Sequence, residues 1–162
     1  MPFDRNRMIG LAALAGALGC WAFAAANAEV AGMTKEEADS LVYERQQVMS
    51  EMDKQGELIG SIVAGEVPPD KLPEVTKALA KSARESVDLW QRKVPGGDEK
   101  PEVWTQHDDF MKRMEHFALK SDEMAKVAQA GNMNGVIELL VEAMPCKECH
   151  DIYRIPKKKP AA

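Results

Sequence analysis

Two cysteines and a histidine stand close together near the end of the sequence, as Cys146, Cys149 and His150. Their C-x-x-C-H spacing is typical of covalent haem attachment. On a helix, two thiols three residues apart lie on one side, so both can form thioethers with the vinyl groups of one haem while the adjacent imidazole reaches the iron. The motif therefore predicts one covalently bound haem c with His150 as an axial ligand.

Three other uses of the cysteine pair compete with haem. The two cysteines could form a structural disulfide if the protein is exported, because disulfides persist in oxidising compartments. A thioredoxin-like dithiol is expected in a βαβ context, and the sequence shows no strand pattern. A zinc site needs two further ligands at metal-binding spacing, and no second C-x-x-C is present. His107 and His116 remain candidate metal ligands, but both stand among charged residues, and we expect them to lie on a solvated surface.

The first 28 residues have the plan of a secretory signal peptide. Two arginines precede an apolar stretch over 8–26, which closes with small residues, and we expect cleavage after Ala28. The mature domain is then 29–162, without stable membrane insertion. Cleavage also removes Cys20, the third cysteine of the chain. The two thiols of the motif are therefore the only ones expected in the mature protein.

The composition indicates a single acidic domain. The chain has 162 residues, of which 45% are hydrophobic and 29% charged, and its formal net charge is −5. This length fits one domain, and the charged fraction is too high for a polytopic membrane protein. The negative charge argues against nucleic-acid binding, because phosphate contacts need a basic surface. Together with the leader, these numbers predict a periplasmic protein.

Four helical segments are expected, and no strand pattern competes with them. The first begins at the capping box formed by Thr34 and Glu37 and ends near Ala64 and Gly65. The other three are expected at roughly 71–93, 102–130 and 133–153, separated by residues rich in proline and glycine. Helices of this length with short connections predict an all-α, antiparallel up-down-up-down four-helix bundle, in which ligand sites lie between facing helices.

The whole mature chain resembles one known family. Residues 146–154, together with the Arg-Gln-Gln-Val-Met run at 45–49, are similar to the cytochrome c′ family, the class II c-type cytochromes. Residues 100–104, followed by Phe110, look like that family's entry to its third helix. The resemblance implies a four-helix bundle that often dimerises, with a haem used for electron transfer or for binding small gases.

The resemblance also implies roles for individual residues. His150 would be the proximal ligand, and the two cysteines would be the attachment points. Arg154 follows His150 by one helical turn and matches a basic residue near the proximal side, although a surface salt bridge would explain it equally well. Arg45 matches an arginine that can approach a haem propionate, and it lies within the apolar stripe of its helix.

Met49 decides between two mechanisms. It lies one turn beyond Arg45, at the position that faces the distal side of the haem in this family. A thioether bound opposite His150 would make the iron six-coordinate and low-spin, and Met/His ligation raises the reduction potential. If Met49 only packs there, the iron is five-coordinate and open to NO or CO. Methionine is also a common core residue, but we predict Met49 as the second axial ligand.

The sequence thus predicts a periplasmic monohaem carrier of single electrons, which exchanges them with redox partner proteins and is not an enzyme. The alternative is a five-coordinate cytochrome c′ that sequesters or buffers NO or CO. A third alternative, a haem-free interaction module, would require the haem motif to be accidental. A homodimer is among the states that the family implies. The basic run 157–159 could steer an anionic partner or form a solvated tail.

Overall fold

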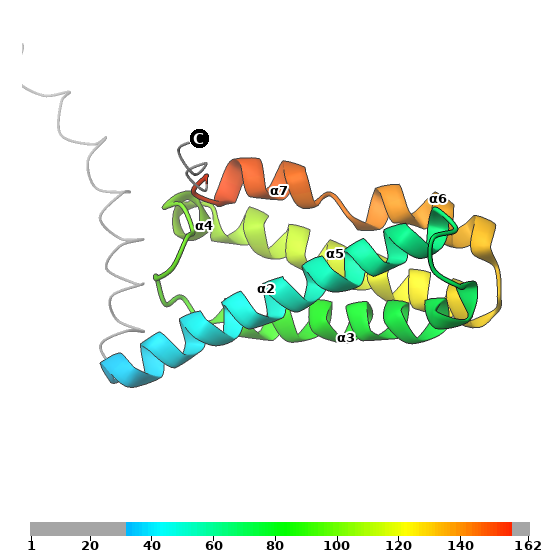
Figure 1. The fold of residues 1–162 in the computed structure, drawn as a ribbon. Helices are drawn as coiled ribbons and strands as arrows, with labels where there is room; N and C mark the ends of the chain where they lie inside the picture. The colour runs from blue at the N-terminus through cyan, green and yellow to red at the C-terminus, as the bar shows by residue number, and fades with distance from the viewer. Residues whose placement is uncertain (1–31, 157–162) are drawn as a thin grey trace, which may run out of the picture.

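The computed structural model describes residues 32–156, and the regular structure in this part is helical apart from one isolated β-bridge (Figure 1). The elements are α2 (Lys35–Val63), the 3-10 helix η1 (Pro69–Lys71), α3 (Leu72–Gln91), α4 (Glu102–Thr105), α5 (His107–Gln129), α6 (Met133–Ala143) and α7 (Cys146–Tyr153). The prediction of an all-α four-helix bundle is confirmed. The expected leader and the basic run 157–159 lie outside the described residues.

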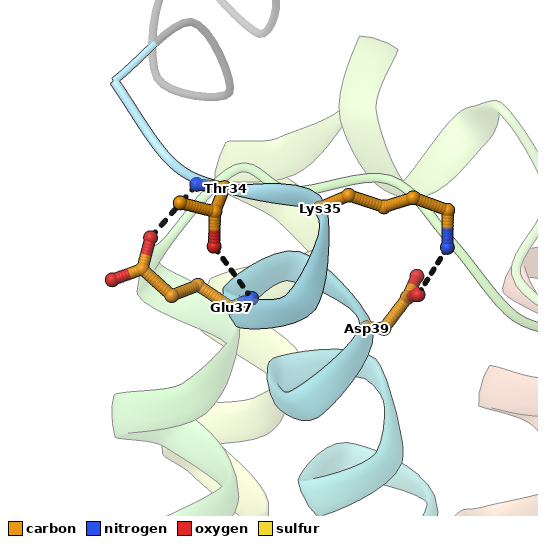
Figure 2. A network of polar contacts seen from close by, with 4 residues as sticks. All are labelled: Thr34, Lys35, Glu37 and Asp39. Atoms are coloured by element: carbon orange, nitrogen blue, oxygen red, sulfur yellow. Dashed lines mark hydrogen bonds and ion pairs between the residues drawn. The ribbon is translucent and has the colours of Figure 1, made fainter.

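The first helix begins and ends at the residues that the sequence indicated. Thr34 Oγ1 accepts a hydrogen bond from the Glu37 N–H at 3.2 Å, and the Glu37 carboxylate accepts one from the Thr34 N–H at 2.8 Å (Figure 2). This reciprocal pair is the predicted capping box. At the other end Gly65 takes the left-handed conformation with φ +77°, which ends the helix.

The two expected helices at 102–130 and 133–153 are each broken, which corrects the predicted boundaries. Gln106 leaves the helical conformation with φ −122° and ψ 36°, and this residue separates α4 from α5. Pro145 lies at the break between α6 and α7, and a proline lacks the N–H that a continuous helix would need there. The fourth element of the bundle is therefore a pair of helices placed one after the other (Figure 1).

The buried side chains form two clusters along the bundle. One is aliphatic and joins α2, α3, α5 and α6, with Ile59, Leu79, Met124 and Val136 among its most buried members. The other contains Trp90, Val103, Phe110, Met114 and Tyr153, and it lies where α3, α4, α5 and α7 meet. The second, which we call the aromatic cluster, positions the helix that carries the haem motif. No helix within 32–156 is long and apolar enough to cross a membrane.

Candidate haem-attachment site

The haem motif occupies the first five residues of α7. Cys146 is exposed and Cys149 is half-buried, and both thiols are free. Burial raises the pKa of each thiol, so both are protonated at neutral pH. Cys149 also packs against the aromatic cluster. One helical turn thus presents two unpaired thiols three residues apart, which fits the donor set of a c-type haem.

The competing uses of the cysteine pair find no support in the described residues. The two cysteines do not form a disulfide with each other. Within 32–156, no group of three or more His, Cys, Asp or Glu side chains is arranged to hold a metal ion, so the zinc alternative finds no ligand cluster there. The βαβ context of a thioredoxin-like dithiol is also missing from this part of the chain.

His150 has the chemistry of a metal ligand. Burial lowers its pKa, and the positive charge of Arg154 acts in the same direction, whereas Asp53 and Asp151 act against them. The neutral imidazole is therefore favoured, and this is the form that binds iron. The carboxylate of Asp53, on α2, acts electrostatically on both His150 and Cys146.

Arg154 lies close to His150, although its backbone is extended and it stands just outside α7. It follows the last residue of α7, and its N–H donates to the His150 carbonyl at 3.0 Å. Both side chains line a shallow pocket of about 310 Å³, together with Asp151, Ile155 and Pro156. The geometry places a permanent positive charge next to His150. A role of Arg154 on a bound haem stays a prediction.

The end of α7 is fixed to the rest of the bundle by several contacts. Tyr153 Oη donates to Asp109 Oδ2 at 2.6 Å, and the Tyr153 ring packs edge-on against Phe110 with 5.1 Å between centroids. The Lys100 N–H donates to the Tyr153 carbonyl at 2.8 Å, and an isolated antiparallel bridge joins Glu99 to Arg154. Because α7 has only eight residues, these contacts set its position.

Arg45 is buried, and its partners are backbone carbonyls. The side chain is 3% exposed. It donates to the Leu89 carbonyl at 3.2 and 3.1 Å, to the Val94 carbonyl at 2.6 Å and to the Arg92 carbonyl. The guanidinium also lies 4.2 Å from the centre of the Trp90 ring. Burial lowers the pKa of Arg45 to about 10, so the charge is kept at neutral pH.

This arrangement gives Arg45 a role that the sequence did not indicate. The last carbonyls of a helix have no partners within it and carry partial negative charge. Arg45 supplies those partners at the end of α3, where it acts as a cap reaching across from α2. The predicted contact of Arg45 with a haem propionate stays a prediction.

Met49 lies on α2 between Arg45 and Asp53. Its side chain is half-buried and packs against both the aliphatic and the aromatic clusters. Along α2 it stands one turn after Arg45 and one turn before Asp53, the carboxylate that acts electrostatically on His150. These three residues share one face of α2. Axial coordination by Met49 stays a prediction.

The prediction that His107 lies on a solvated surface is wrong, whereas His116 is exposed as expected. His107 is only 8% exposed, its Nε2 lies 3.0 Å from the Trp90 carbonyl, and its ring stacks on Trp104. His107 is the first residue of α5. Its ring points to the carbonyl of Trp90, which lies in the last turn of α3 and has no partner within that helix. The neighbouring Trp104 was the one sequence signal for this, because an aromatic ring offers a stacking partner.

A protein-family comparison and a structural comparison agree on what this chain is similar to. A family model described as cytochrome C' matches residues 40–154, which span α2 from Ser40 to the end of α7. No curated protein matches the chain.

Among solved structures, the chain is similar to ferric cytochrome c prime from Alcaligenes xylosoxidans, with 22% identity and a TM-score of 0.68, covering 74% of this chain and 97% of that one. A nitric oxide complex of a leucine-to-alanine variant of that cytochrome gives the same values. A ferrous arginine-to-lysine variant with bound NO matches at 21% identity and a TM-score of 0.68, with coverage of 74% and 97%. These likenesses show that the bundle has the same fold.

Proposed function

The chain belongs to the cytochrome c′ family and carries one covalently attached haem c, and we propose that this haem binds nitric oxide on the side opposite His150. The observation that carries the proposal is the turn of α7 that holds two free thiols followed directly by a histidine whose neutral form is favoured. Covalent attachment through the thiols would hold the haem in place while His150 binds one side of the iron.

Nitric oxide complexes among the structural relatives support this choice of ligand. When only one protein group binds the iron, the haem supplies an open coordination position for a diatomic gas. The contribution of this chain would be the α2 face around Met49, which would cover the open side and exclude water. Reversible occupation of that side would sequester or buffer NO or CO.

A second candidate function, single-electron transfer, is favoured by the thioether of Met49. This side chain is half-buried and shares a face of α2 with Asp53, whose charge acts on His150. If the thioether bound the iron, both axial positions would be filled and the reduction potential raised. Partner proteins would then exchange electrons with the haem. In both roles we propose a periplasmic protein, exported by its leader, that does not turn over a substrate.

Optical spectra of the purified holoprotein separate the two functions. The gas-binding function predicts a five-coordinate, high-spin spectrum that is unchanged in Met49→Leu, together with rapid binding of CO and NO to the ferrous form. The electron-transfer function predicts a low-spin ferric spectrum with a methionine-to-iron charge-transfer band.

The variant Met52→Leu is the matched control, because Met52 is buried in α2 one turn from Met49. Loss of the charge-transfer band in Met49→Leu but not in Met52→Leu would contradict the gas-binding function. Release of haem from the denatured wild-type chain would overturn covalent attachment and both functions with it.

A further inference from the structure

The buried tyrosine of α7 has a carboxylate ready to take its proton. Tyr153 is 3% exposed, and its hydroxyl donates to Asp109 Oδ2 at 2.6 Å, the distance of a strong charge-assisted hydrogen bond. Asp109 is half exposed and is held in place by Arg113, whose Nε donates to the same oxygen at 2.7 Å. A proton leaving Tyr153 would therefore reach a fixed acceptor that is also in contact with water.

Tyr153 is also close to the points at which α7 holds the haem. It follows His150 by three residues, which is less than one turn of the same helix. Cys149 packs against the aromatic cluster that includes Tyr153. His150 would bind the iron and Cys149 a vinyl group, so Tyr153 lies three and four residues from the two bonded connections to the haem.

We propose that Tyr153 is a one-electron donor that protects the haem when a peroxide oxidises it. Hydrogen peroxide takes up two electrons and two protons and becomes two molecules of water. When those electrons come from the haem, Tyr153 returns one of them. The phenolic O–H bond breaks, and the proton forms a new O–H bond at Asp109 Oδ2. The product is a neutral tyrosyl radical. One of the two oxidising equivalents has then moved from the haem to the protein, and the other remains at the haem.

Trp90 of the aromatic cluster, and Trp104, which packs against that cluster, are poorer electron donors than Tyr153. The Arg45 guanidinium lies 4.2 Å from the centre of Trp90 and 5.4 Å from that of Trp104. Removing an electron from either ring would create positive charge beside a buried cation. Trp90 Nε1 is buried and has no hydrogen-bond partner in the described part of the chain, so its proton has no acceptor. Oxidation should therefore stop at Tyr153.

The chain offers a matched control in its other tyrosine. Tyr43 lies on α2 and is 61% exposed, and the sequence has no third tyrosine. A tyrosyl radical must therefore belong to one of these two residues. The variants Tyr153→Phe and Tyr43→Phe both keep the aromatic ring and remove only the hydroxyl. Asp109→Asn keeps an oxygen that accepts the hydrogen bond but does not take the proton.

The test mixes ferric holoprotein with hydrogen peroxide and follows the radical by electron paramagnetic resonance and haem loss by absorbance. Wild type and Tyr43→Phe should give a tyrosyl signal. Tyr153→Phe should lose this signal and bleach its haem faster, and Asp109→Asn should give a weaker signal. A nitroso spin trap on wild-type protein, located by mass spectrometry of its peptides, should label the α7 peptide and requires no variant to fold.

Two outcomes would overturn the proposal. One is a trap adduct at Tyr43 with a radical that persists in Tyr153→Phe. The other is the absence of any tyrosyl signal in wild type, with equal rates of haem bleaching in wild type and Tyr153→Phe. The inference requires the covalent haem but not nitric oxide binding, so its failure would leave the gas titration of the proposed function unaffected.

Discussion

Tyr153 of α7 donates a hydrogen bond to Asp109 of α5, and this contact joins the helix with the C-x-x-C-H motif to the bundle. Asp109 accepts a second hydrogen bond from Arg113, one turn further along α5. The carboxylate thus holds both its own helix and its neighbour. Its charge state should be visible in the stability of the whole protein.

The Asp109 contacts predict a loss of stability in acid. The hydrogen bonds from Arg113 and then Tyr153 lower the pKa of Asp109 in the folded state. The ionised carboxylate of Asp109 therefore stabilises the fold in full above the pKa that this carboxyl has in the unfolded chain. The stabilisation is lost as the pH falls through the lower pKa of the folded state. Urea unfolding of holoprotein at a series of pH values should show that the free energy of unfolding falls less steeply in acid for Asp109→Asn than for wild type. An identical fall in the two proteins would contradict this role.

The same contact predicts an alkaline transition. Burial, followed by the hydrogen bond to Asp109, raises the pKa of Tyr153 to about 12. The stability from the protonated phenol is complete below pH 10.0 and is lost as the pH rises toward the folded pKa. In Tyr43→Phe, where Tyr153 is the only tyrosine, tyrosinate absorbance should have its midpoint near pH 12. A midpoint at the ordinary value would show that Tyr153 is solvated.

Replacing Arg45 should be costly. In Arg45→Met the Leu89, Arg92 and Val94 carbonyls lose a buried donor, and we expect a loss of about 3 kcal/mol in the free energy of unfolding. Arg45→Lys keeps a charge but not the planar set of donors, so it should recover only part of the loss.

The control for Arg45 is Arg84→Met, which removes a solvent-exposed ion pair with Asp122 and should change stability by less than about 1 kcal/mol. Urea unfolding of the holoproteins measures both. Equal effects of Arg45→Met and Arg84→Met would show that Arg45 does not cap α3.

Two glycines at the end of α2 should respond to alanine with opposite signs. Gly65 has φ +77°, so Gly65→Ala should destabilise the protein by about 1 kcal/mol through backbone strain. Gly60 lies inside the helix, and a Cβ there meets nothing within 4 Å, so Gly60→Ala should stabilise it by about 1 kcal/mol. Thermal unfolding of the two variants compares them directly, and changes of the same sign would contradict the helix end described here.

Features set by neighbours in the sequence could be predicted. The capping box at Thr34 and the helix end at Gly65 depend on residues within one turn, and both were found where expected. The same holds for the motif at 146–150, whose spacing is a property of a single helical turn. The break at Pro145 was missed because apolar residues continue on both sides of it, although the missing N–H is a local signal.

Features set by distant partners could not be predicted. The position of Arg45 in an apolar stripe indicated a buried charge, but its acceptors lie 44 to 49 residues away and are backbone atoms. His107 was assigned to the surface because of its charged neighbours, whereas the Trp90 carbonyl that binds it belongs to α3. In both cases the acceptor is a backbone carbonyl, so the hydrogen-bond partner itself has no signature in residue types.

The acceptors of Arg45 have an evolutionary consequence. Leu89, Arg92 and Val94 contribute only main-chain oxygens, and any amino acid at these positions offers the same oxygen. A substitution at one of them therefore needs no compensating change at position 45. Methods that infer contacts from correlated substitutions among homologues should fail to detect this cap, and selection on it should appear as invariance of a single arginine.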